Sequence, residues 1–145
     1  MSFMNSLKIS ASGLSSQRTR MNAISSNLAN INTTRTPEGG PYRRKDVVFE
    51  TVNAGELFGN VFQNKVNRNY TGVKVSDIKE DPSAIRLKYD PSHPDSNDEG
   101  YVALPDINMM KEMVDLLEAK RSYEANVNAL RTSRDMALKA LEIGR

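Results

Sequence analysis

Residues 95–106 place oxygen-bearing side chains at the spacing of a calcium-binding EF-hand loop. Asp95, Asn97, Glu99 and Gly100 fall at positions 1, 3, 5 and 6 of such a loop, and Asp106 falls at position 12. Position 12 requires the longer, bidentate glutamate, however, and neither the proline before it nor the lack of a preceding helix pattern fits an EF-hand. The pattern is typical of an acidic turn, and we expect no metal site.

The single histidine, His93, lies between Ser92 and Pro94 in a turn-rich stretch. A general base or metal ligand needs partner side chains nearby, and the sequence places none beside this residue. No phosphate-binding glycine motif is present, and the chain contains no cysteine, which excludes thiolate catalysis and zinc–thiolate sites. We therefore expect a protein with no catalytic activity, no cofactor and no small-molecule substrate.

The basic cluster YRRK, residues 42–45, has the charge to contact phosphates. Only three adjacent cations are present, Asp46 follows them directly, and Tyr42 is the only aromatic residue beside them. A net charge of +2 over 145 residues also gives no strong attraction to nucleic acid. We expect the cluster to contact acidic neighbours at the start of a strand, with nucleic-acid binding through Arg43 and Arg44 as an alternative.

Residues 3–32 carry an apolar repeat of seven residues, which predicts a long helix with a coiled-coil-like seam. Most other residues in this segment are Ser, Asn, Gln and Arg, so the apolar stripe is narrow. We expect Asn30 or Asn32 to end the helix in a left-handed conformation. The predicted seam residues are Leu7, Leu14, Met21, Ile24, Leu28 and Ile31.

Residues 106–143 show the second helical pattern, with apolar residues spaced by three and four. Pro105 prevents an earlier start, Asp106 is expected to cap the free amides, and Gly144 stands where a helix-ending glycine belongs. The predicted seam residues are Met113, Leu116, Tyr123, Val127, Leu130 and Leu141.

The middle of the chain has the alternating pattern of β-strands. We predict strands over residues 43–52, 72–80 and 84–90, and a loop over residues 53–71. The fold class is therefore mainly α with a small β part. Residues 1–32 and 106–145 form long terminal helices paired as a coiled coil, and residues 33–105 form a β-rich connecting or outer segment. Narrow apolar stripes of this kind mark assembly surfaces, so we expect further copies or other subunits to cover them.

The sequence GLSSQRTRMNAISSNLANINTT, residues 13–34, resembles the N-terminal signature of flagellar axial proteins. The continuation TRTPEGGPYRRKDVVF and the C-terminal EMVDLLEAKRSYEANVNAL narrow the resemblance to the FlgC-type proximal rod protein family of the flagellar basal body. The motif marks the joint at which the chain leaves the first helix. Its residues are Asn27, Leu28, Ala29, Asn30, Asn32, Gly39, Gly40, Tyr42 and Arg43.

The resemblance implies a structural subunit of a hollow rod that transmits torque and conducts exported subunits. It implies partners among other rod subunits, copies of this chain, the inner-membrane ring, rod-adaptor proteins and the flagellar type III export apparatus. It also implies a place in the periplasmic part of the basal body, reached without a cleaved signal peptide. From the residues alone, the alternative is a soluble coiled-coil adaptor or chaperone that forms no polymer.

Overall fold

The chain forms two long helices and two β-hairpins. A computed structural model describes residues 3–53 and 71–144. Most of the predicted loop 53–71 therefore lies outside the described residues. The elements follow in the order α1 (Phe3–Ala29), β1 (Lys45–Asn53), β2 (Thr71–Glu80), β3 (Ile85–Tyr89), β4 (Tyr101–Pro105) and α2 (Met109–Ile143). Both long helices and the three expected strands are present, which confirms the predicted fold class.

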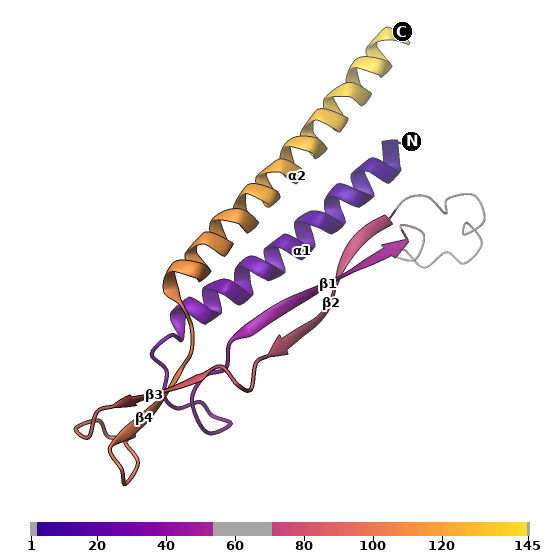
Figure 1. Cartoon of the computed structure of the whole chain (residues 1–145). Helices are drawn as coiled ribbons and strands as arrows, with labels where there is room; N and C mark the ends of the chain where they lie inside the picture. Colours follow the sequence, from indigo (N-terminus) through magenta and orange to yellow (C-terminus); the bar gives the residue numbers. More distant parts are fainter. Residues whose placement is uncertain (1–2, 54–70, 145) are drawn as a thin grey trace.

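The two helices pack side by side and run antiparallel, so that both chain ends lie at the same end of the molecule (Figure 1). Helix α1 has 27 residues and α2 has 35. In Figure 1 the C-terminal end of α2 extends beyond the N-terminal end of α1. No described helix is both long and apolar enough to span a membrane.

Small and polar residues make a line of close contacts between the two helices. The Ser6 and Ser133 hydroxyls are 3.4 Å apart, and Asn27 contacts Glu112 near the other end of the pair. Between them, a Cβ built on Gly13 would lie 3.0 Å from the Asn126 amide nitrogen. These positions are spaced by seven or fourteen residues in each helix. Small side chains on this line let the two axes approach closely.

The predicted apolar repeat is therefore displaced by one residue from the contact line. One residue corresponds to a rotation of about 100° around a helix, so Leu7, Leu14, Met21 and Leu28 lie on a flank and remain half-buried. On α2, the fully buried small residue is Ala119, with 0% of its surface exposed. The helix pair thus keeps part of its apolar stripe open on the surface.

The helix ends differ from the prediction in two details. No residue other than glycine has a positive φ in the described chain, so neither Asn30 nor Asn32 is left-handed. Instead, the Asn30 side chain donates to the Ser26 carbonyl at 2.9 Å, where α1 ends. At the start of α2 the cap is Asn108, whose side chain accepts from the Lys111 amide, and the expected cap Asp106 is an exposed residue before it.

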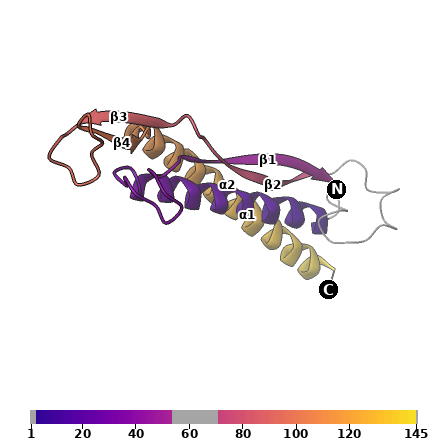
Figure 2. The same cartoon turned by 90° about the horizontal axis from the view of Figure 1, so that it is seen from below.

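Strands β1 and β2 form an antiparallel hairpin with a register shift between Val48 and Phe49. The hairpin lies along α1, on one side of the helix pair (Figure 2). A two-stranded sheet is marginally stable by itself, and α1 supplies its support. The Ser12 hydroxyl accepts from the Val73 amide at 3.2 Å, and the Ser16 hydroxyl donates to the Val73 carbonyl at 3.3 Å. Two serines one helical turn apart thus satisfy the backbone of β2 at this position.

Strands β3 and β4 form a second antiparallel hairpin at the end of the molecule away from the chain termini (Figure 1). The sequence predicts β3 but not β4, because YVALP is short and ends in proline. The inward residues Val102 and Leu104 are buried, whereas Leu87 on the opposite face is exposed. Asp106 donates its amide to the Ala84 carbonyl, which leads the chain from this hairpin into α2.

Replacing Gly13 with leucine tests the close approach of the helices. We expect Gly13→Leu to lower the free energy of unfolding by about 1 to 3 kcal/mol, because the larger side chain meets Asn126 and forces the helices apart. Asn126→Ala in the same chain should recover part of that loss, while Asn126→Ala alone serves as the control. Chemical denaturation followed by circular dichroism measures all three. A Gly13→Leu chain as stable as the natural one contradicts the contact line.

Candidate functional site

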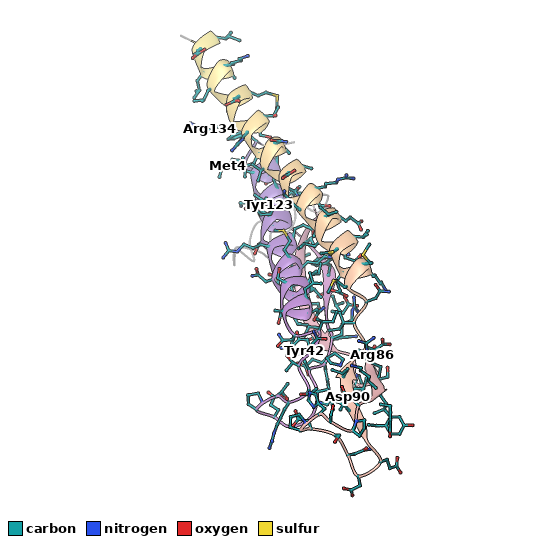
Figure 3. All side chains as sticks on the ribbon, turned by 90° about the vertical axis from the view of Figure 1, so that its left-hand side faces the viewer. Met4, Tyr42, Arg86, Asp90, Tyr123 and Arg134 are labelled. Carbon is teal, nitrogen blue, oxygen red and sulfur yellow. The ribbon has the colours of Figure 1, made fainter. Side chains whose placement is uncertain are left out.

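A buried polar cluster joins the two helices to the first hairpin. It consists of Asn27 near the end of α1, Tyr42 and Arg44 just before β1, Lys45 as the first residue of β1, and Glu112 in the first turn of α2. We call this cluster the polar joint. In Figure 3 the labelled Tyr42 marks it, at the end of the helix pair nearest the β3–β4 hairpin.

Asn27 is the centre of the polar joint, with none of its surface exposed. Its amide nitrogen donates to the Lys45 carbonyl at 2.9 Å and to Glu112 Oε2 at 3.2 Å. Its oxygen accepts from the Lys45 amide at 2.9 Å and from the Tyr42 hydroxyl at 3.1 Å. The side chain uses all of its usual donors and acceptors. Because it pairs with both backbone groups of Lys45, it acts as a strand partner for the first residue of β1.

Glu112 is the acidic member of the polar joint, and 1% of its side chain is exposed. The Arg44 Nε donates to Glu112 Oε1 at 2.7 Å, so the carboxylate is bonded through both oxygens. A buried charge is tolerated only when it is paired and hydrogen-bonded. Burial acts to lower the pKa of Arg44, but its hydrogen bonds and charge interactions with Glu112 and Asp46 outweigh burial and raise that pKa above its usual value.

The basic cluster YRRK is largely neutralised, as expected for a strand end beside acidic neighbours. Arg44 contacts Glu112 and Asp46, and the Lys45 ammonium lies 3.4 Å from Glu80. Arg43, the remaining cation of the cluster, is exposed and lines a shallow surface hollow. The cluster holds the fold together at this point, because its charges face the protein's own carboxylates.

The remaining motif residues shape the turn after α1. Gly39 and Gly40 have φ values of +92° and +77°, which side chains other than glycine rarely adopt. Asn30 accepts a hydrogen bond from the Thr33 hydroxyl at 3.1 Å. Ala29 and Asn32 are exposed, and Leu28 is half-buried. Of the predicted joint residues, the polar joint itself includes only Asn27 and Tyr42.

The predicted seam residues differ in burial. Ile24 is buried, while Met113 and Leu141 are exposed, at 48% and 71%. The others are half-buried in this chain, namely Leu7, Leu14, Met21, Leu28, Ile31, Leu116, Tyr123, Val127 and Leu130. Tyr123 lies midway along the helix pair in Figure 3.

Sequence reasoning missed Arg44 and Glu112 as members of the polar joint, and Gly13 and Asn126 as members of the contact line. An acidic residue in the first turn of a helix is common because its charge interacts favourably with the helix dipole. The sequence alone therefore does not distinguish Glu112 from an ordinary acid at the start of a helix. The spacing of seven residues from Glu112 through Ala119 and Asn126 to Ser133 was the one available indication. It was hidden because three of these four residues are polar and the fourth, Ala119, is small.

The acidic turn beyond β3 is organised by its own hydrogen bonds. The Asn97 side-chain oxygen accepts from the Tyr101 amide at 2.7 Å, and Asp95 accepts from the Thr34 hydroxyl at 2.8 Å. His93 accepts a hydrogen bond from the Asp95 amide. A hydrogen bond from Ser92 lowers the pKa of Asp90. Among the residues that the structure describes, no three His, Asp or Glu side chains converge as a metal site would require.

Two family sequence models match the ends of this chain. The first, described as "Flagella basal body rod protein", matches residues 7–35. The second, described as "Flagellar basal body rod FlgEFG protein C-terminal", matches residues 98–143. The first match includes most of α1 and the first part of the motif, up to residue 35, and the second includes β4 and α2.

Full-length relatives share the whole length of the chain. It is 47% identical to the flagellar basal-body rod protein FlgC of Bacillus subtilis, over 100% of both chains. It is 41% identical to FlgC of Borreliella burgdorferi, over 99% of this chain and 98% of that one. The FlgC protein of Escherichia coli O157:H7 is 40% identical, over 99% of each chain.

An isosteric change at the centre of the polar joint tests its hydrogen bonds. We expect Asn27→Asp to lower the free energy of unfolding by about 3 to 5 kcal/mol at neutral pH, because the oxygen that replaces the amide nitrogen faces Glu112 and the Lys45 carbonyl with no hydrogen to donate. The introduced carboxyl should have a raised pKa in the folded chain. Its proton is therefore favoured by folding, and the destabilisation should shrink as the pH falls towards 4. Denaturation at both pH values measures this, and an equal loss at both contradicts the assignment.

Removing Arg44 tests the buried ion pair. We expect Arg44→Met to cost about 3 to 5 kcal/mol of unfolding free energy, because Glu112 is left as an unpaired buried charge. The double variant Arg44→Met/Glu112→Met should be more stable than Arg44→Met alone, since both charges are gone. Lys74→Met, at an exposed pair with Glu50, is the matched control and should change stability little. A double variant no more stable than Arg44→Met would show that Glu112 carries no uncompensated charge.

Proposed function

The chain belongs to the FlgC family of flagellar basal-body rod proteins, and from this premise we propose that it is a structural subunit of the proximal rod. The observation that carries the proposal is similarity over the full length of both chains, at 47% identity to the Bacillus subtilis protein. The family is one of structural proteins, not enzymes. The protein's task is therefore to hold its neighbours in a rigid assembly.

The helix pair supports a role in the inner, channel-lining layer of the rod. Its two helices are long and narrow, and they leave apolar residues open on several faces. Such faces are covered when subunits assemble. We assign residues 1–32 and 106–145 to this inner layer, and residues 33–105 to the connecting or outer part.

The polar joint supports the transmission of force between these two parts. A load on the helices reaches β1 through Asn27 and Lys45, and reaches α2 through the contact between Arg44 and Glu112. Each of these hydrogen bonds has a defined direction and a buried partner, so rotation of one element against the others breaks bonds that water cannot readily replace. The polar joint thereby resists changes in the angle between the helix pair and the strands.

The partners follow from membership in the family. Assembly with other rod subunits is implied by the rod family itself. We extend this to copies of the same chain, to the inner-membrane ring with its rod-adaptor proteins, and to the flagellar type III export apparatus. The half-buried seam residues are the proposed interface with these partners.

A charged substitution in the seam tests the proposed function. In a flagellated cell whose own gene for this protein has been replaced by variants, we expect Leu14→Asp to abolish swimming, because a carboxylate on the seam blocks packing of neighbouring subunits. Ala11→Asp, at an exposed position of the same helix, should retain swimming. Motility in soft agar and recovery of the chain in purified basal bodies measure the outcome. Absence of the natural chain from purified basal bodies would overturn the proposed function.

A further inference from the structure

The outer edge of strand β3 has backbone groups without partners. The Asp90 amide donates to the Gly100 carbonyl at 2.9 Å, which continues the register of the β3–β4 ladder. Hydrogen-bonded and non-hydrogen-bonded pairs alternate along an antiparallel ladder, so residues 86 and 88 bond to β4 and the backbone groups of Leu87 and Tyr89 point away from it. Among the described residues, these outward groups have no hydrogen-bond partner.

The opposite edge of this hairpin, on β4, is largely occupied. The Asn97 side chain accepts from the Tyr101 amide at 2.7 Å, the Asn97 amide donates to the Tyr101 carbonyl at 2.9 Å, and Pro105 has no amide hydrogen. All five residues of β3 are exposed, and Figure 1 shows no helix or strand beside its outer edge. Open strand edges of this kind pair with extended segments of other chains. We call the outer edge of Ile85–Tyr89 the β3 edge.

The side chains along the β3 edge alternate between apolar and cationic. Leu87 and Tyr89 lie on one face and are 67% and 64% exposed, and the Tyr89 ring contacts that of Tyr101 with 5.3 Å between centroids. Arg86 and Lys88 lie on the other face and are also exposed. Residues directly opposite each other on paired strands have neighbouring side chains. A strand added at this edge therefore places its residues alternately beside an apolar and a cationic side chain.

The two cations face the central residues of such a strand. Arg86 makes no ion pair within the described chain, and Lys88 makes an exposed one with Asp90, at 3.6 Å. Arg86 and Asp90 are both labelled in Figure 3. Asp106 lies on the same face as Arg86 but on the β4 side of the hairpin, so it is farther from an added strand by about 4.8 Å, the spacing of one strand. Acidic residues opposite Arg86 and Lys88 therefore complement this edge, whereas basic residues there are repelled.

A second copy of this chain does not fit the β3 edge. Antiparallel pairing of two such edges with Leu87 opposite Leu87 places Arg86 opposite Lys88 at both ends, and like charges directly opposite are destabilising. A shift of two residues in either direction places Arg86 opposite Arg86 or Lys88 opposite Lys88. In the whole sequence, no two acidic residues are separated by a single residue, so no segment of this chain presents acids to both cations. The partner is therefore a different protein.

We propose that the β3 edge binds an extended segment of another protein, in which acidic and apolar residues alternate, as an added antiparallel strand. The partner residue opposite Leu87 exchanges two backbone hydrogen bonds with it. The two neighbours of that residue are acidic and face Arg86 and Lys88, and a further apolar residue lies beside Tyr89. The hairpin becomes a three-stranded sheet, which is more stable than two strands alone. This contact does not involve the helix seam and does not depend on the proposed function.

Binding of a synthetic peptide to the purified full-length chain tests the proposal. The probe is the end-capped peptide TVEVEVT, and the control peptide TVKVKVT has lysine in place of both glutamates. Amide hydrogen exchange is measured for each residue by NMR, with and without peptide. At a concentration of about ten times its Kd, we expect TVEVEVT to slow exchange at Leu87 and Tyr89 by about tenfold. The amides of Arg86 and Lys88, already bonded to β4, should change little, and TVKVKVT should have no effect.

Two variants distinguish strand addition from a general attraction between charges. Arg86→Glu/Lys88→Glu reverses both exposed cations, and we expect it to bind TVKVKVT and not TVEVEVT. Leu87→Pro removes an outward amide hydrogen and leaves the ladder with β4 intact, an orientation in which an edge strand tolerates proline. It should weaken the binding of TVEVEVT by about tenfold, whereas Leu87→Thr, which keeps the amide, should weaken it less. Circular dichroism verifies that each variant is folded, and the charge reversal decides the matter if Leu87→Pro is not.

Three outcomes overturn the inference. The first is unchanged exchange at Leu87 and Tyr89 with TVEVEVT at about 1 mM, the weakest affinity that we accept for a specific contact. The second is equal binding of the glutamate and lysine peptides. The third is slower exchange only at residues outside the β3–β4 hairpin. None of these outcomes bears on the proposed function, which is tested by motility and by the presence of the chain in purified basal bodies, so the two failures are distinguishable.

Discussion

The hydrogen bonds of Asn27 are the constraint on which the arrangement of the whole chain depends. Three segments distant in sequence meet at this side chain, namely the end of α1, the start of β1 and the first turn of α2. A neutral amide suits the position because it donates to two oxygens and accepts from two donors at once. A carboxylate cannot donate to Glu112, and an apolar side chain leaves the Lys45 backbone unpaired. Asparagine therefore suits position 27 because it completes all of these hydrogen bonds.

In the contact between the helices, polar and small residues have a different role from the apolar repeat. The line along which they touch consists of Ser, Gly, Ala and Asn, together with the Asn27–Glu112 pair. Small residues there permit close approach, whereas the apolar repeat lies on a flank and is only half covered. Further burial of these half-covered side chains would add hydrophobic stabilisation in proportion to the apolar area removed from water. The flank that the helices leave open is therefore the surface that we propose for contacts with neighbouring subunits.

Much of the fold follows from patterns along the sequence. The two helices and strands β1, β2 and β3 follow from spacing and alternation, because each reflects a local periodicity of side chains. Strand β4 is not predicted from the sequence, because its five residues end in Pro105 and resemble a turn. The predicted cap of α2 is Asp106, whereas the cap in the structure is Asn108. Both residues have side chains that can cap a helix, and the path of the chain out of the β3–β4 hairpin decides between them.

The sequence by itself determined the family, the two long helices and their narrow apolar stripes, because these depend on residue types and on spacing within one segment. It also indicated that Asn27 stands where the chain leaves the first helix. Only the tertiary structure decided that Asn27 binds within its own chain, that Glu112 and Arg44 complete the polar joint, and that the helices touch one residue away from the leucines. These outcomes depend on contacts between residues about 15 to 130 positions apart in the sequence. A periodic pattern within one helix does not indicate which face of that helix a distant helix will cover.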